Sequence, residues 1–164
     1  MEKSIKSSSS GLNPPKKNCL LLSLLIVQMI FIFTMSSFGP DSSNAQSGGI
    51  VQVLSGILPN ANQNDLVFLV RKTAHFSEYA LLGILFYLYF SQKKFPRFYL
   101  SGPLLFSALA SFLYACTDEF HQLFVPGRSG QLSDVIIDTL GATTGVLFIS
   151  LIIQLKNKFL IKHG

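Results

Sequence analysis

The hydrophobic positions of this chain form long runs that short polar segments separate. Residues 19–38, 66–90 and 135–155 are each apolar over a length that can cross a lipid bilayer as a helix. A further run, residues 99–116, contains Gly102-Pro103 near its start, and proline is tolerated in the first turn of a helix. The pattern predicts an all-α fold: an integral membrane four-helix bundle with about four transmembrane helices.

The polar segments define the remaining organisation. Residues 1–18 and 156–164 are predicted to be tails, the first of them disordered because it is rich in Ser, Lys and Pro. Residues 39–65 contain no Lys or Arg and are predicted to be an external loop, followed by a three-helix core at residues 66–155. Within that loop one helical stripe is apolar, so a helix lying on the membrane surface and an irregular loop are both open. The stripe comprises Ile50, Val51, Leu54, Ile57 and Leu58.

The first run has two interpretations. Its basic start and the following Ser43-Asn44-Ala45 resemble a signal peptide with its cleavage site. Its apolar core is longer than that of most signal peptides, which favours a retained membrane anchor.

The distribution of charge predicts the orientation. The chain has 164 residues and a net charge of +5, and most of its 13 basic residues precede the first run, follow the second or follow the fourth. If four helices alternate in direction, these positions share one side, which the positive-inside rule makes cytoplasmic. Both termini are therefore predicted to be cytoplasmic, and every acidic residue except Glu2 falls on or near the other side. The basic excess reflects topology, and no nucleic-acid binding is predicted.

Composition supports the membrane class. Only 13% of the residues are charged and 49% are hydrophobic, whereas soluble domains carry about 25% charged residues. Tryptophan is absent, and the candidates for an interfacial aromatic belt are Tyr79, Tyr87, Tyr89, Tyr99 and Tyr114. The two cysteines, at positions 19 and 116, belong to opposite ends of the bundle and are predicted to be unpaired.

Ionisable side chains inside or beside apolar runs are the main functional signal, because a charge near the bilayer centre costs about 2.5–3.5 kcal/mol on insertion scales. With alternating helices, the start of the second run, the end of the third and the start of the fourth meet at the same outer level. These three segments hold most of the candidate residues of one polar cluster. The cluster comprises Arg71, Lys72, His75, Glu78, Asp118, Glu119, His121, Gln122, Arg128, Asp134 and Asp138.

Helical spacing places these residues on shared faces. Arg71, His75 and Glu78 follow one face of the second run, and Asp118, His121 and Gln122 share a face of the third. On the fourth run, Asp134 and Asp138 share a face with Gly141 and Gly145. These glycines form a G-x-x-x-G pattern that allows close helix packing within the monomer or a homo-oligomer contact.

The connection between the third and fourth runs carries the remaining basic residue of the cluster. Pro126-Gly127 suits a type II turn, in which glycine takes a positive φ. Arg128 follows at once, and its planar fork favours bidentate recognition of carboxylate or phosphate.

Several chemistries fit the cluster. The spacings His75-x-x-Glu78 and Asp118-x-x-His121 resemble the carboxylate–histidine pairs of metal bundles. Neighbouring cations would repel a metal, and neither a metal nor a cofactor is predicted. A hydrolase or transferase with a histidine acid–base group and a proton-coupled carrier are alternatives. Binding of an anionic lipid headgroup or cell-wall precursor requires the fewest assumptions. Purely structural roles are also open. Arg71 and Lys72 would then anchor the helix at the membrane interface, and Asp134 would cap the fourth helix. His75 with Glu78, and Asp118 with His121, would be pairs that hold the bundle together.

The chain resembles the VanZ-like family of small bacterial membrane proteins, which is named after a teicoplanin (glycopeptide) resistance determinant. The resemblance covers residues 71–145. Its motifs are Arg71-Lys72-Thr73-Ala74-His75-Phe76-Ser77-Glu78-Tyr79, Leu82-Gly83, Thr117-Asp118-Glu119-Phe120-His121-Gln122, Pro126-Gly127-Arg128, Asp134, Asp138, Gly141 and Gly145.

The resemblance implies a multi-pass protein of the cell membrane that contributes to tolerance of lipophilic glycopeptides or other envelope stress. It implies no particular biochemical activity. One position departs from the family pattern: Asp138 stands where that pattern often has Asn, so a carboxylate there is not obligatory. The site residues that the resemblance carries over are His75, Glu78, Asp118, Glu119, Gln122, Arg128 and Asp134.

Overall fold

The computed structural model describes residues 14–93 and 102–163. Within these ranges the secondary structure consists of five helices without a strand, which confirms the predicted all-α class. The helices are α1 (Pro14–Ser36), α2 (Pro40–Ile57), α3 (Gln63–Phe90), α4 (Gly102–Gln122) and α5 (Leu132–His163).

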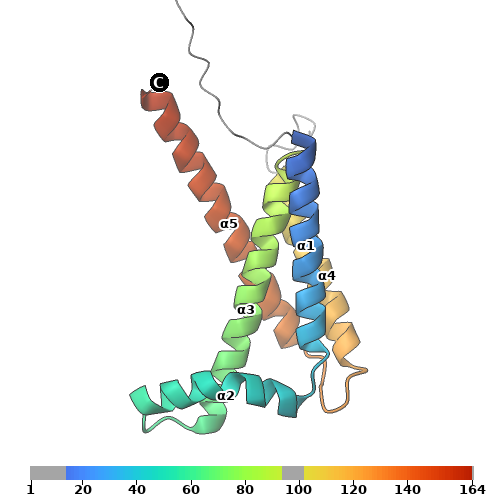
Figure 1. Cartoon of the computed structure of the whole chain (residues 1–164), viewed down its shortest axis with the longest axis vertical. Coiled ribbons are helices and arrows are strands. Elements are labelled where there is room, and N and C mark those ends of the chain that lie inside the picture. The colour runs from blue at the N-terminus through green and yellow to red at the C-terminus, as the bar shows by residue number, and fades with distance from the viewer. Residues whose placement is uncertain (1–13, 94–101, 164) are drawn as a thin grey trace, which may run out of the picture.

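The helices form an upright bundle with one helix lying across its end. α1, α3 and α4 run alongside one another, and α5 crosses them with its C-terminal half leaning away (Figure 1). α2 lies crosswise at the end of the bundle where α1 finishes and α3 begins (Figure 1). α3 is the central element, since it contacts each of the other four helices.

Two helix boundaries differ from the prediction. α1 begins at Pro14 rather than at residue 19, because proline fits the first turn of a helix, so residues 14–18 are not part of a disordered tail. α5 continues to His163, where a tail at residues 156–164 was predicted. No glycine or proline interrupts this segment before Gly164, and lysines near a helix C-terminus are favourable. The predicted start of the third run at Tyr99 lies outside the described residues.

Of the two alternatives for residues 39–65, the structure has the helix. Pro40 provides a favourable first turn, and the helix ends at Ile57, two residues before Pro59. Val51 is buried, whereas Ile50, Val53 and Ile57 are more than half exposed. The helix therefore packs one side on the bundle and leaves an apolar stripe uncovered.

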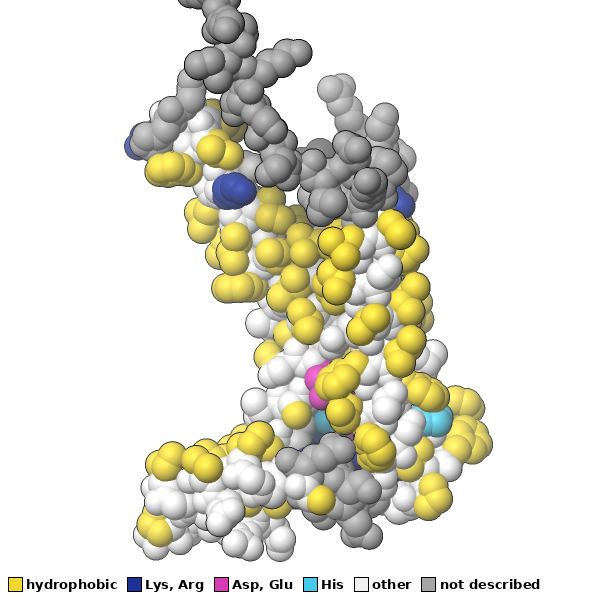
Figure 2. Space-filling model, viewed as in Figure 1, with side chains coloured by type: hydrophobic (Ala, Val, Ile, Leu, Met, Phe, Trp, Pro, Cys, Tyr) yellow, Lys and Arg dark blue, Asp and Glu magenta, His cyan; other side chains and the backbone are white. Residues whose placement is uncertain are grey.

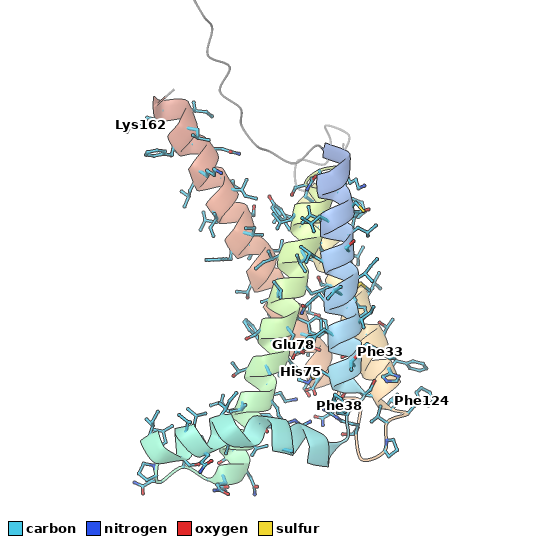
Figure 3. All side chains as sticks on the ribbon, viewed as in Figure 1. Phe33, Phe38, His75, Glu78, Phe124 and Lys162 are labelled. Atoms are coloured by element: carbon cyan, nitrogen blue, oxygen red, sulfur yellow. The ribbon has the colours of Figure 1, made fainter. Side chains whose placement is uncertain are left out.

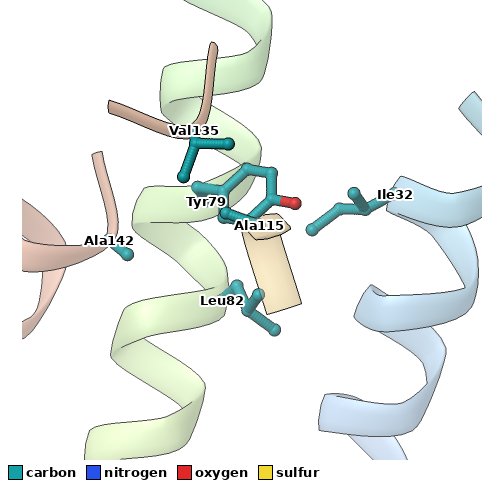
Figure 4. Packing of buried hydrophobic residues seen from close by; sticks show 6 residues of the cluster. All are labelled: Ile32, Tyr79, Leu82, Ala115, Val135 and Ala142. Carbon is teal, nitrogen blue, oxygen red and sulfur yellow. The ribbon is translucent and has the colours of Figure 1, made fainter. Parts of the chain in front are cut away.

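The buried core lies where α3 meets α1, α4 and α5. Tyr79 and Leu82 of α3 are fully buried and pack with Ile32, Ala115 and Ala142 (Figure 4). The interpretation of Tyr79 as a residue of an interfacial belt is therefore wrong. A ring at that helical position points to the centre of the bundle because α1, α4 and α5 surround α3 there.

The crossing of α3 and α5 is unusually close. A Cβ on Gly145 would lie 2.1 Å from the carbonyl oxygen of Ala80, and one on Gly141 would lie 2.3 Å from that of Phe76. Backbone thus packs directly on backbone. Both glycines of the G-x-x-x-G pattern are occupied by contacts within the monomer.

Much of the outer surface is apolar. On the face that Figure 2 shows, hydrophobic side chains are spread along the bundle above α2, and many large ones are exposed, such as Val27 at 61% and Phe148 at 60%. Among the described residues, two helices are long and apolar enough to cross a membrane, α1 over Asn18–Ser36 and α5 over Leu132–Lys162. The predicted bundle of four transmembrane helices is therefore not confirmed, because α3 and α4 are not among these two. Charged and polar residues lower the hydropathy of both, among them His75 and Glu78 in α3 and Asp118 and Glu119 in α4.

Candidate functional site

One end of the bundle gathers the polar cluster. The start of α3, the end of α4, the following loop and the start of α5 surround a cavity of about 270 Å³. In Figure 2 acidic, histidine and basic side chains come together just above α2, below the hydrophobic belt. Six predicted site residues line this cavity: Arg71, Lys72, His75, Gln122, Arg128 and Asp134.

A tight turn aims Arg128 at the cavity. The backbone N–H of Arg128 donates to the carbonyl of Val125 at 3.1 Å, and Gly127 between them has a φ of 76°. This is the type II turn that Pro126-Gly127 predicted. The Nε–H of Arg128 donates to the carbonyl of Phe38 at 2.9 Å, which fixes the guanidinium against the end of α1.

Arg71 and Arg128 face the cavity, and neither has a carboxylate partner among the described residues. In the described part of the chain, neither has an acidic oxygen within 4.0 Å. Burial lowers the pKa of Arg128 and the positive charge of Arg71 lowers it further, while the acids Glu119, Asp118 and Asp134 oppose this shift from beyond 4.0 Å. The guanidinium groups are thus close enough to repel each other, and an anion between them would relieve that repulsion.

Lys72 differs from the two arginines because its charge is already paired. Its Nζ forms a salt bridge with Asp134 at the start of α5 and lies 5.2 Å from the centre of the Phe68 ring. Both side chains of the pair are largely buried, at 19% and 15% exposure. The pair joins α3 to α5 at the cavity wall and leaves the two arginines as the cationic groups open to a ligand.

His75 lies at the inner end of the cavity, opposite a buried acid. Its Nδ1 is 3.8 Å from Oδ1 of Asp138, too far for a hydrogen bond. Asp138 is fully buried, and no hydrogen-bond partner for either of its carboxyl oxygens is found among the described residues. At this separation the carboxyl and the imidazole are within ion-pair distance but share no hydrogen bond.

Two further acids of the cluster are buried in α4, away from the larger cavity. Asp118 is 2% exposed and its Oδ1 accepts from the hydroxyl of Ser36 in α1 at 2.6 Å. Glu119 is 5% exposed and its Oε2 accepts from the backbone N–H of Gln131 at 2.8 Å. These two carboxylates tie α4 to α1 and to the loop, and neither lines the larger cavity.

Glu78 and His121 lie apart from the larger cavity. Glu78 lines a smaller cavity of about 140 Å³, which shares Arg71, His75 and Arg128 with the larger one. His75 and Glu78 point toward the interior of the bundle in Figure 3. His121 lines neither space; it lies against α1, with its Nε2 3.1 Å from the hydroxyl of Ser37.

The geometry offers little to a metal ion. Among the described residues, no three or more His, Cys, Asp or Glu side chains are grouped so that they could hold one. The two histidines of the carboxylate–histidine pairs do not converge on one point, because His75 faces the cavity and His121 lies against the end of α1.

Sequence reasoning missed three polar side chains that support the cluster. Ser36 binds Asp118, the Gln28 amide donates to the carbonyl of Glu78 at 3.1 Å, and the hydroxyl of Tyr79 is buried close to Asp118 and Asp138. Polar residues at positions 28 and 36 of an otherwise apolar helix were the available signal.

Comparison with known proteins gives one family match. The model of the family described as VanZ/LLP1 matches residues 21–153, which extends the motif-bearing segment 71–145 in both directions. Searches of curated proteins and of solved structures find no significant match.

Proposed function

Because the chain belongs to the VanZ-like family, we propose that it is a multi-pass protein of the cell membrane whose outer polar cavity binds an anionic component of the envelope. In this proposal α1, α3, α4 and α5 cross the bilayer, both termini are cytoplasmic, and α2 lies at the outer surface. Binding of the anion contributes to tolerance of glycopeptides and of envelope stress.

The position of the charges supports this topology. Lys162 lies at the opposite end of the bundle from His75 and Glu78 (Figure 3). From Arg71 to the end of α3 at Phe90 the helix rises by about 28 Å, close to the roughly 30 Å thickness of the hydrocarbon core, and Lys93 follows just beyond. The exposed apolar belt between the two ends would be unfavourable in water and is favourable in lipid.

The observation that carries the proposed binding function is the pair of arginines facing one cavity, neither of which has a carboxylate partner in the part of the chain that the structure describes. A phosphate or carboxylate between Arg71 and Arg128 would accept charge-assisted hydrogen bonds from both. Lys72 is held by Asp134 and does not compete for the same anion. The family is named after a glycopeptide resistance determinant, which supports a ligand from the cell envelope.

The test is a complementation experiment. A strain lacking the gene receives wild type, the double variant Arg71→Gln with Arg128→Gln, or the control Lys158→Gln, whose lysine is exposed at the far end of α5. We expect the double variant to lose teicoplanin tolerance while it is still present in the membrane, and the control to keep it. Full tolerance in the double variant would refute the function of the cavity.

A second function, hydrolysis or transfer on a lipid or cell-wall precursor, is favoured by the placement of His75. An imidazole next to the buried Asp138 and at the inner end of an anion-binding cavity is suited to proton transfer. Lipid and precursor profiles of the deletion strain separate the two functions. An enzyme is supported if a precursor accumulates in the deletion strain, wild type removes it and the variant His75→Gln does not. Binding alone is supported if the deletion leaves the lipid and precursor profiles unchanged.

A further inference from the structure

The smaller cavity gives the anion site an apolar extension. It shares Arg71, His75 and Arg128 with the larger cavity, and its other walls differ in character. Ser47 and Glu78 add polar groups to it, and its apolar walls come from three helices, α1, α2 and α3: Met35, Ile50, Val70 and Ala74. A ligand between the two arginines would therefore meet polar walls on one side and hydrocarbon on the other.

This apolar extension opens toward the hydrophobic surface of the bundle. Ala74 is exposed, and Leu81, two turns further along α3, is 46% exposed. On α2, Ile50 begins the exposed stripe that continues through Val53 and Ile57. In Figure 2 the hydrophobic side chains of α2 gather on the side turned toward the hydrophobic belt of the bundle.

We propose that the ligand is a membrane lipid with a phosphate headgroup, which enters sideways from the outer leaflet. Its phosphate lies between Arg71 and Arg128, and the first part of its chain lies against Ile50, Val70 and Ala74. The smaller cavity holds only the start of a chain, and the remainder lies along the apolar outer face of α3. This inference rests on the proposed anion-binding function and adds the class of the ligand and its route.

Charge and apolar surface together favour an amphiphile over a free anion. A free phosphate or a soluble carboxylate would use the arginines and leave the apolar walls bare. A neutral lipid would fill the apolar walls and leave the two guanidinium groups repelling each other. Only a ligand with both parts satisfies the two cavities at once.

The test compares two probes on the purified full-length protein in dodecyl maltoside micelles. Dodecyl phosphate carries the chain, inorganic phosphate does not, and phosphorus NMR line broadening reports the binding of each. Two buried methylenes already correspond to about a tenfold gain in affinity. We therefore expect dodecyl phosphate to bind at least about tenfold more tightly than inorganic phosphate. The double variant Arg71→Gln with Arg128→Gln, in the same micelles, provides the baseline for partition of the chain into detergent.

Filling the apolar extension separates the two parts of the site. Ala74→Phe places a ring in the smaller cavity and should remove the advantage of dodecyl phosphate while the binding of inorganic phosphate is unchanged. Leu113→Phe, at an exposed position of α4 that lines neither cavity, is the control and should behave as wild type. If Ala74→Phe does not fold, Ile50→Asn removes an apolar wall from exposed α2 and should reduce the same advantage.

The outcomes distinguish this inference from the proposed function. Equal affinity of wild type for both probes, or an undiminished advantage in the folded extension variant, overturns the lipid proposal and leaves anion binding intact. Failure of wild type to bind either probe overturns both.

Discussion

The close crossing of α3 and α5 makes a sharp prediction for Gly141. Substitution Gly141→Ala places a Cβ 2.3 Å from the carbonyl oxygen of Phe76, where ordinary contact begins at 3.4 Å. The obstructing atom belongs to the backbone of a packed helix and cannot rotate away. α5 must retreat by about 1 Å, and overpacking of this kind costs about 1–3 kcal/mol.

The retreat also affects the site. His75 and Asp138 already stand 3.8 Å apart, and moving α5 away from α3 lengthens this separation beyond the range of an ion pair. The overpacking cost of about 1–3 kcal/mol should lower the melting temperature of the detergent-solubilised variant by roughly 3–10 °C relative to wild type.

A matched control is available in α2. A Cβ on Gly49 would meet no atom within 4 Å, so Gly49→Ala should gain about 0.5–1 kcal/mol from helix propensity and melt at or above the wild-type temperature. If Gly141→Ala melts as high as wild type, the close crossing is refuted. A third outcome is that wild type is a dimer and Gly141→Ala is a monomer that melts at a lower temperature. In that case the glycine packs between two copies, and the contact within the monomer is wrong.

Three further predictions concern the polar cluster. In a double-mutant cycle on Lys72→Ala and Asp134→Ala, chemical denaturation should give a coupling energy of about 1 kcal/mol, since both side chains keep some contact with solvent at the cavity, and an energy near zero would exclude the salt bridge. Ser36→Ala should cost about 1–3 kcal/mol in thermal unfolding because it removes the donor to buried Asp118, and a loss no larger than that of exposed Ser133→Ala would contradict this hydrogen bond. Gly127→Val should weaken inorganic phosphate binding several-fold, because a β-branched residue disfavours a φ of 76° and the turn would change, whereas unaltered binding would show that the turn does not position the site.

The sequence could predict the polar end of the bundle because helical spacing and alternating direction follow from local rules. Arg71, His75 and Arg128 were placed together from the register of α3 and from the Pro126-Gly127 turn, and the structure has all three facing one cavity. These arguments need only the helical period and the lengths of the hydrophobic runs.

What the sequence could not predict depends on how the helices rotate relative to one another. Asp118 and His121 share a helical face as predicted, but that face meets the end of α1, where Ser36 and Ser37 contact them, and neither residue lines the larger cavity. Tyr79 was assigned to an interface because tyrosine is common there, but α3 is enclosed on several sides. The partners of a buried polar residue come from other helices, as Ser36 shows, and a single sequence contains no record of that contact.

The central claim, that Arg71 and Arg128 form an anion site open to the outer face, is tested most directly by accessibility in intact cells. Cys19 and Cys116 are replaced by serine, and single cysteines are introduced as Ser129→Cys at the cavity and Lys158→Cys at the far end of α5. A membrane-impermeant maleimide should label position 129 in intact cells, dodecyl phosphate should protect it, and position 158 should react only after permeabilisation. Labelling of position 158 but not of position 129 in intact cells would contradict the account.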